Sequence, residues 1–178
     1  MTVVIGLAVP AIVIGVPIAH EMINAGKGAS TPREALVRWV YTFEDATRSG
    51  ELMAERLIVA SQRDKLTKQR RDYIATRTTD TERHPEAVPG RFELADPPPN
   101  TEPARQTITG NSATVVMYWR VTWTAVNDPS GLRSKGTSLP WRAELRQERD
   151  GWRLFSVAIA PWCAANSNDA STPAYSRC

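Results

Sequence analysis

The chain has 178 residues, a length typical of a single domain, and 42% of them are hydrophobic, which favours a folded chain over a wholly disordered one. With 22 Lys and Arg against 19 Asp and Glu, the net charge of +3 is too small to indicate a dedicated nucleic-acid-binding protein. Two Cys and two His, widely spaced, exclude a zinc finger or a multi-cysteine metal framework. We therefore expect no metal, no cofactor and no nucleic-acid partner.

The N-terminal segment is uncharged, because every Lys, Arg, Asp and Glu follows residue 20. As a helix, residues 2–19 would span about 27 Å, close to the hydrocarbon thickness of a bilayer. A cleaved secretory signal is an alternative, but no basic residue precedes the apolar run and Pro17-Ile18-Ala19 is a poor cleavage site. A buried core helix is a further alternative. We expect residues 1–19 to form a single transmembrane anchor and residues 20–30 to link it to a domain.

The orientation of this anchor is open from charge alone. Basic residues on its C-terminal side favour a cytoplasmic domain under the positive-inside tendency, and they include Lys27, Arg33 and Arg38. The two cysteines favour the opposite side. A bond between Cys163 and Cys178 would tether the polar tail, residues 163–178, contribute about 3 kcal/mol and fit an exported domain. Two unrelated thiols are the alternative, and we expect a domain at the cell membrane, outside the cytoplasm.

Three helices are predicted next. Thr31-Pro32-Arg33-Glu34 matches a capping box with Pro at the first helical position, and apolar residues follow at helical spacing up to Ala46. Gly50 is well placed to end this helix. A second helix is predicted over 51–61 and a third over 64–76, followed by a loop over 78–90.

The third helix carries a cluster of basic side chains. The cluster consists of Arg63, Lys65, Lys68, Arg70 and Arg71. Such a run is most often a solvated helix face, and the alternatives are acidic lipid headgroups near the anchor or an acidic partner protein. No interleaved aromatic residues support nucleic acid.

From residue 91 the hydrophobic period changes to two, which predicts strands. Strands are expected over 91–95, 104–109, 113–126, 139–148 and 152–162. In the fourth, Leu139, Trp141, Ala143 and Leu145 should face inward, while Arg142, Glu144, Arg146 and Glu148 face solvent. The sum is an α+β domain over 31–162, with helices packed on a curved antiparallel sheet of four or five strands.

Tryptophan is concentrated on the inward faces of these elements. Trp39, Trp119, Trp123, Trp141 and Trp152 could line a pocket for an apolar molecule, or could fill the core. Both interpretations are compatible with the pattern.

Two segments carry a family resemblance. The helix start TPREALVRWVYTF (31–43) and the final strand GWRLFSVAIAPW (151–162) resemble the nuclear-transport-factor-2-like superfamily. The resemblance implies a cone of curved sheet over a helix, in a group that includes isomerases, dehydratases and non-catalytic scaffolds. One anchor followed by one such domain is similar to assembly factors of conjugative type IV secretion machines, especially in Gram-positive bacteria. Anchored accessory proteins of actinobacterial lipid import look similar, and 18 Arg against 4 Lys fits a GC-rich actinobacterial genome.

Catalytic chemistry has weak support in the sequence. Enzymes of the resembled fold use acid–base groups inside the cone, for which Asp72, Tyr73 and Tyr118 are candidates. Asp72 and Tyr118 are more typical of surface positions, and His20 and His84 do not resemble a buried base. Nucleophile elbows, P-loops and dinucleotide fingerprints are missing from the sequence.

The expected function is therefore a non-catalytic, membrane-anchored structural component of a conjugation or type IV secretion complex. It would contact the other subunits of that membrane complex, and further copies of itself. The alternative is a cell-envelope accessory protein that binds a lipid or another small apolar ligand in the cone.

Overall fold

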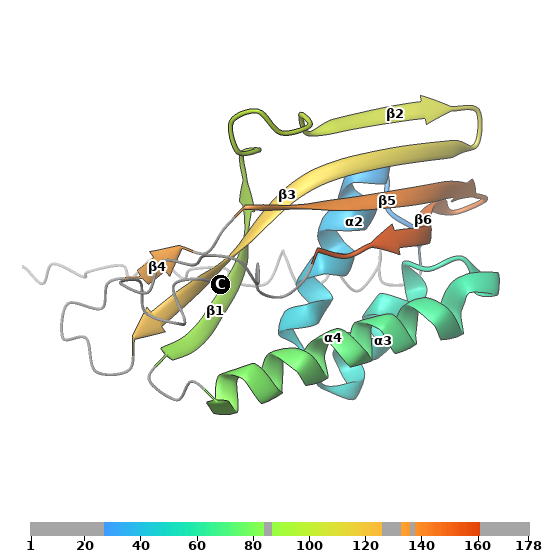
Figure 1. The fold of residues 1–178 in the computed structure, drawn as a ribbon. Coiled ribbons are helices and arrows are strands. Elements are labelled where there is room, and N and C mark those ends of the chain that lie inside the picture. The colour runs from blue at the N-terminus through green and yellow to red at the C-terminus, as the bar shows by residue number, and fades with distance from the viewer. Residues whose placement is uncertain (1–26, 84–86, 126–132, 136–137, 161–178) are drawn as a thin grey trace, which may run out of the picture.

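The structure, a computed structural model, describes residues 27–83, 87–125, 133–135 and 138–160 (Figure 1). The predicted anchor, residues 1–19, and the tail, residues 163–178, lie outside the described residues. Among the described residues, no helix is both long enough and apolar enough to cross a bilayer.

Helices form the first half of the described chain. They are α2 (Pro32–Tyr41), the 3-10 turn η1 (Thr42–Glu44), α3 (Arg48–Arg56), the 3-10 turn η2 (Ala60–Gln62) and α4 (Arg63–Arg83). Helix α2 starts where the capping box predicts, because the Thr31 hydroxyl accepts from the Glu34 N–H at 3.1 Å. The Glu34 carboxylate reaches back one residue further than expected, to the Ser30 N–H at 2.9 Å. The cap is confirmed, with its second half shifted by one residue.

The end of the first helix differs from the prediction. Helix α2 ends at Tyr41, where the Thr42 hydroxyl donates to the Trp39 carbonyl at 2.6 Å and the chain tightens into η1. Gly50 does not end this helix but lies inside α3, where a Cβ atom would come within 2.2 Å of the Asp45 carbonyl oxygen. Gly50 is therefore needed for a close approach between two segments, and the prediction that it terminates the helix is wrong.

Helix α4 is longer than the predicted 64–76. It continues to Arg83, through a stretch predicted as a loop, and its Thr76 and Thr78 hydroxyls donate to carbonyls one turn earlier at 3.0 Å each. These internal bonds let polar threonines continue the helix. The predicted loop over 78–90 is wrong at both ends, because α4 continues to Arg83 and a strand already begins at Ala87.

Strands form the second half. They are β1 (Ala87–Ala95), β2 (Arg105–Thr109), β3 (Ser112–Ala125), β4 (Arg133–Lys135), β5 (Leu139–Glu148) and β6 (Gly151–Ala158). All pairings between them are antiparallel, in the order β1-β3-β5-β6. Strand β2 pairs with the first part of β3 and β1 with the second part, on the same side of it. The three-residue β4, which the sequence did not reveal, brings the described sheet to six strands.

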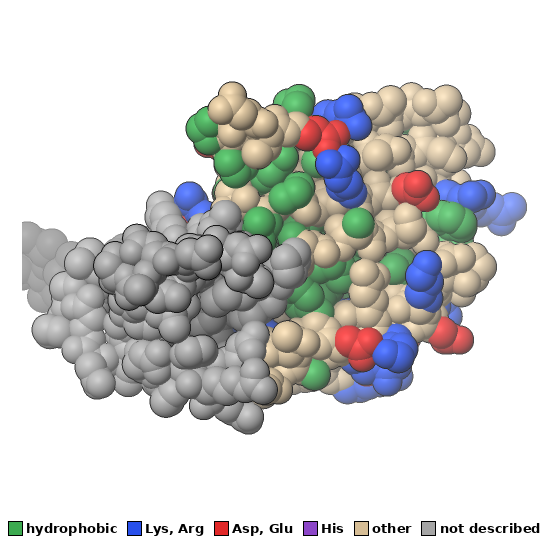
Figure 2. Space-filling view, viewed as in Figure 1, with side chains coloured by type: hydrophobic (Ala, Val, Ile, Leu, Met, Phe, Trp, Pro, Cys, Tyr) green, Lys and Arg blue, Asp and Glu red, His purple; other side chains and the backbone are tan. Residues whose placement is uncertain are grey.

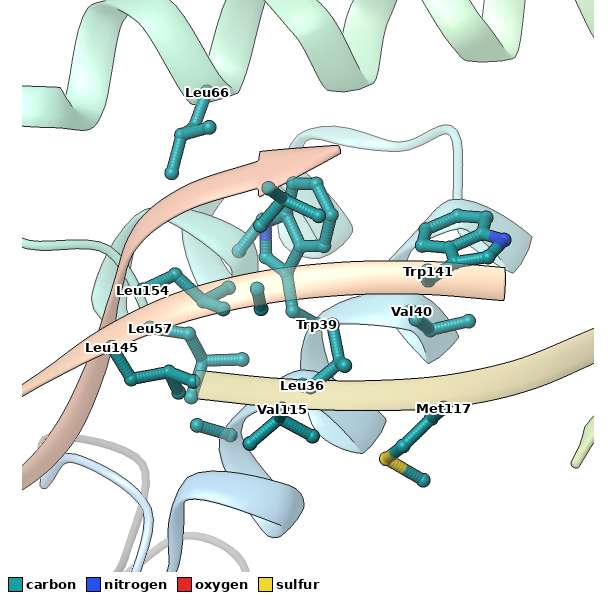
Figure 3. Close-up of a cluster of buried hydrophobic side chains, with 14 of the residues drawn as sticks. Leu36, Trp39, Val40, Leu57, Leu66, Val115, Met117, Trp141, Leu145 and Leu154 are labelled. Carbon is teal, nitrogen blue, oxygen red and sulfur yellow. The ribbon is translucent and has the colours of Figure 1, made fainter. Parts of the chain in front are cut away.

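The helices cover one face of this curved sheet (Figure 1). The alternation predicted for β5 is confirmed, since Trp141, Ala143 and Leu145 are buried while Arg142 and Glu144 are exposed. Side chains from α2, α3 and α4 meet those of β3, β5 and β6 in one core (Figure 3). The α+β class and the packing of helices on a curved antiparallel sheet are therefore as predicted.

Candidate interaction site

The tryptophans pack against one another and against phenylalanine inside the core. The ring centroids of Trp39 and Phe43 are 4.7 Å apart, those of Trp39 and Trp141 are 6.3 Å apart, and both pairs meet edge to face. Trp119 and Trp152 are also buried. The side chain of Trp123 lies outside the described residues. Four of the five predicted tryptophans thus contribute their bulk to the core.

The three acid–base candidates lie in different environments. Asp72 is exposed and accepts a hydrogen bond from Lys68 Nζ at 2.6 Å. Tyr73 packs among aromatic rings, 5.1 Å from Phe43 and 5.7 Å from Trp141, and burial raises the pKa of its hydroxyl well above the usual range. Tyr118 lies on the opposite face of the sheet. The structure therefore does not bring these three groups together.

Tyr118 is buried, contrary to the prediction of a surface tyrosine. Residues 96–104 connect β1 to β2 and pass over the outer face of the sheet, the face opposite the helices. We call this segment the proline strap, because it contains Pro97, Pro98, Pro99 and Pro103. The Tyr118 hydroxyl donates to the Glu102 carbonyl in the strap at 2.6 Å, and the side chain is 2% exposed. A strand periodicity cannot reveal such a cover, because the covering residues come from an irregular segment.

The predicted basic face loses Arg70, which points into the protein and is 2% exposed. Its guanidinium donates to the Thr42 hydroxyl at 3.1 Å and to the carbonyls of Thr42 and Asp45, and it lies 5.9 Å from the Phe43 ring. Burial lowers the pKa of Arg70. This side chain fastens η1 and the residue that follows it, Asp45, to α4, so its role is structural.

The other four basic residues are exposed on α4, mixed with acidic ones. Lys68 pairs with Asp72, and Arg71 lies 3.9 Å from Glu51 of α3. Figure 2 shows Lys and Arg side chains next to Asp and Glu side chains over this helix. Arg63 and Lys65 have no ion pair among the described residues. The surface is therefore of mixed charge rather than a continuous basic face.

The two edges of the sheet are finished differently. At the β6 edge, the chain itself covers the strand. Trp152 N donates to Ala29 O at 2.8 Å, and Ala29 N donates back to Trp152 O at 3.1 Å. Leu154 N donates to Leu57 O at 2.7 Å, and Leu154 O accepts from Val59 N at 2.9 Å. The outward backbone groups of Trp152 and Leu154 are therefore all paired.

At the opposite edge, no described residue pairs with the outward side of β2, and we call this the open edge. All five of its residues are exposed, and Figure 1 shows the strand at the margin of the sheet, away from α4. The turn at Gly110-Asn111 joins β2 to β3, so Thr109 pairs with Ser112 and Thr107 with Thr114. Gly110 has a φ of +56°, which glycine adopts without strain.

Hydrogen-bond alternation shows which β2 groups face outward. Asn111 O accepts from Gln147 N of β5 at 2.8 Å, so odd-numbered residues at the start of β3 direct their backbone groups toward β5. Even-numbered residues such as Ser112 and Thr114 then bond to β2, through Thr109 and Thr107. The N–H and C=O groups of Gln106 and Ile108 consequently point away from the sheet, and no described residue pairs with them.

An apolar side chain accompanies these free backbone groups. Ile108 is 52% exposed on the concave side of the sheet, and Leu94 of β1 is 45% exposed further along the same margin. Gln106 is anchored, because its side-chain oxygen accepts from Arg33 N at the start of α2 at 3.1 Å. The open edge therefore combines unpaired backbone groups, an exposed isoleucine and a fixed position relative to the core.

A small notch of about 290 Å³ lies where β1 ends and the proline strap begins. Its walls include Arg33 from α2, Leu94 and Asp96, and Met117, Tyr118 and Arg120 from β3. Arg120 lies 3.4 Å from Glu93, so part of the positive charge is already balanced. The notch is a shallow depression near the open edge. Its lining contains both basic and acidic side chains, so it does not indicate one class of ligand.

The predicted pair Cys163 and Cys178 lies outside the described residues. The tether between them stays a prediction.

Comparisons with known proteins yield structural neighbours only. No family model matches the chain, and no curated protein matches it. One similar structure is a protein of unknown function from Mycobacterium tuberculosis, with 14% identity, coverage of 89% of this chain and 86% of that chain, and a TM-score of 0.45. A suggested dehydratase of the nuclear-transport-factor-2-like family from Streptomyces avermitilis has 13% identity, coverage of 72% and 94%, and a TM-score of 0.42.

A nuclear-transport-factor-2-like superfamily protein from Salmonella enterica has 12% identity, coverage of 76% and 92%, and a TM-score of 0.40. At these identities and TM-scores, the likenesses assign neither a family nor a function to this chain.

Proposed function

We propose that this chain is a non-catalytic, membrane-anchored structural component of a conjugation or type IV secretion complex, built on a nuclear-transport-factor-2-like domain. It acts through protein–protein contacts with other subunits of that membrane complex. Residues 2–19 hold it in the cell membrane, and the domain lies outside the cytoplasm. The capped helix α2, which crosses the concave face of a curved antiparallel sheet, supports the domain type.

The observation that carries the proposal is the contrast between a filled concave face and an open sheet edge. Trp39, Phe43 and Trp141 pack edge to face against one another on the concave side of the sheet, which is where the resemblance would place the acid–base groups of an enzyme. Gln106 and Ile108 instead present backbone groups to the outside. An extended edge with unpaired groups is a common docking mode between proteins.

Loss of DNA transfer is the direct test. In a host that carries the gene beside a conjugative ATPase, deletion should lower the transfer frequency at least a hundredfold, and the wild-type gene should restore it. Substitution Ile108→Pro removes an outward N–H while leaving the ladder to β3 intact, and should restore transfer poorly. Substitution Ile108→Ala keeps that N–H and serves as the control. Unchanged transfer after deletion would refute the proposal.

An envelope protein that binds an apolar ligand is the second candidate. One observation favours it, because the indole Nε1 atoms of Trp39 and Trp119 are buried and no described residue accepts from them. A ligand with an acceptor oxygen would satisfy these groups. Titration with fatty acids while following tryptophan fluorescence tests this. A saturable change that is lost in Trp39→Phe would favour the ligand, and no change at any concentration would exclude it.

A further inference from the structure

The open edge of β2 has a sequence that complements itself. An added antiparallel strand must pair with Gln106 and Ile108, because their N–H and C=O groups point outward and no described residue pairs with them. When the added strand is a second β2, one register satisfies both copies, with Gln106 opposite Ile108 of the other copy and Ile108 opposite Gln106. This register places a two-fold axis at Thr107.

We propose that two copies of this chain associate through their β2 strands, antiparallel and centred on Thr107, and so share one continuous sheet. Each Gln106–Ile108 pair exchanges two backbone hydrogen bonds, and the two pairs give four bonds across the axis. This inference deepens the proposed function by naming the partner at the open edge, and it rests on that function only in using the same edge.

Charge and side-chain pairing are compatible with this arrangement. Thr107 faces Thr107 across the axis in a non-hydrogen-bonded pair, a favourable combination in antiparallel sheets. Arg105, the charged residue of the strand, faces Thr109 and is balanced by Glu102 of its own copy at 2.7 Å. No like charges oppose each other. The two Ile108 side chains become diagonal neighbours on the concave side, which shields both from water.

The edge also lacks the features that normally prevent such pairing. Between Arg105 and Thr109 there is no proline, lysine or bulge, and the register with β3 is continuous. On the β1 part of the same margin, by contrast, the Phe92 N–H donates to the Glu44 carboxylate at 2.8 Å. Glu44 therefore pairs with one N–H on the β1 part of this margin, while no described residue pairs with the outward groups of β2. Five residues make a short contact, so we expect a weak dimer that concentration in a membrane would favour.

Cysteine cross-linking of the full chain tests the register. In the proposed dimer the Thr107 Cα atoms lie about 4.5 Å apart, within the range for a disulfide, whereas the two Arg105 residues lie roughly 14 Å apart. Substitution Thr107→Cys should therefore give a disulfide dimer on air oxidation with copper phenanthroline. Arg105→Cys and Thr109→Cys should give none separately, and should cross-link when the two proteins are mixed.

Mass mapping of the linked peptides separates these bonds from any made by Cys163 or Cys178, and the wild-type chain gives the background. Adding Ile108→Pro to Thr107→Cys should lower the dimer yield at least tenfold, while Ile108→Ala should lower it much less. Equal cross-linking of all single variants, or none above wild type, would overturn the self-association. In that case a loss of DNA transfer in Ile108→Pro would leave the proposed function standing, with a different protein at the edge.

Discussion

The β6 edge and the β2 edge of one sheet show two solutions to the same physical problem. Unpaired backbone groups at a sheet edge can pair with strands of other molecules. At the β6 edge these groups form hydrogen bonds with residues of the same chain, namely Ala29, Leu57 and Val59. The β2 edge has no such cover among the described residues. Among the described residues, the fold thus covers one edge and not the other, and this difference is the reason why our proposal places the interaction at β2.

The largest loss of stability is expected at the β6 edge, where the backbones of Gly151 and Gly28 approach closely. Gly151 has a φ of +136°, and a Cβ atom there would come within 2.6 Å of the Gly28 backbone. Substitution Gly151→Ala should lower the free energy of unfolding by about 4 kcal/mol, from backbone strain and the clash together. Gly110 at the open hairpin also has positive φ, but a Cβ atom there would meet nothing within 4 Å, so Gly110→Ala should cost only about 1 kcal/mol. Urea unfolding compares the two, and equal losses would remove the contrast between the edges.

The next largest loss of stability is expected on the buried side of α4, compared with its exposed side. Substitution Arg70→Met leaves the carbonyls of Thr42 and Asp45 without their donor and should cost about 3 kcal/mol. The neighbouring Arg71→Met, at an exposed position, should change stability by less than about 0.5 kcal/mol. Similar losses in thermal unfolding would mean that Arg70 is not the clamp described above.

A smaller effect concerns the proline strap. Substitution Tyr118→Phe removes the hydroxyl that donates to Glu102 O and should cost about 1 kcal/mol. Hydrogen exchange should rise at Thr101 and Glu102 in the strap and stay unchanged in β6. A uniform rise through the sheet would show that the hydroxyl does not hold the strap specifically.

Sequence patterns predicted the elements that obey a local rule. The Thr31 cap and the alternation along β5 depend on neighbouring residues, so both could be read directly. The burial of Arg70 and the cover over Tyr118 depend on contacts between distant segments. A period of hydrophobicity contains no information about those contacts.

The sequence predicted the strand that forms the candidate site, but not its position at the edge of the sheet. The strand over 104–109 was predicted, but its position at an edge follows from strand order, which periodicity does not determine. A polar strand with Ile108 as its only large apolar residue, next to a glycine turn, was the available signal. The tryptophans drew attention to the interior instead, because their number suggested a pocket as readily as a core.

The smallest effect is a pH dependence at the start of α2, beside the open edge. The hydroxyl of Ser30 holds the pKa of Glu34 below its ordinary 4.5, with further help from the Ser30 N–H and Arg38. A lowered pKa in the folded state contributes stability above pH 4.5, and this contribution is lost as the pH falls through the folded value. Because Glu34 is partly solvated, Glu34→Gln should cost only on the order of 0.5 kcal/mol at pH 7, and less at pH 3. Thr31→Ala removes a group that does not titrate, so its loss of about 1 kcal/mol should be the same at both pH values. Parallel pH profiles for the two variants would place the pH dependence elsewhere in the chain.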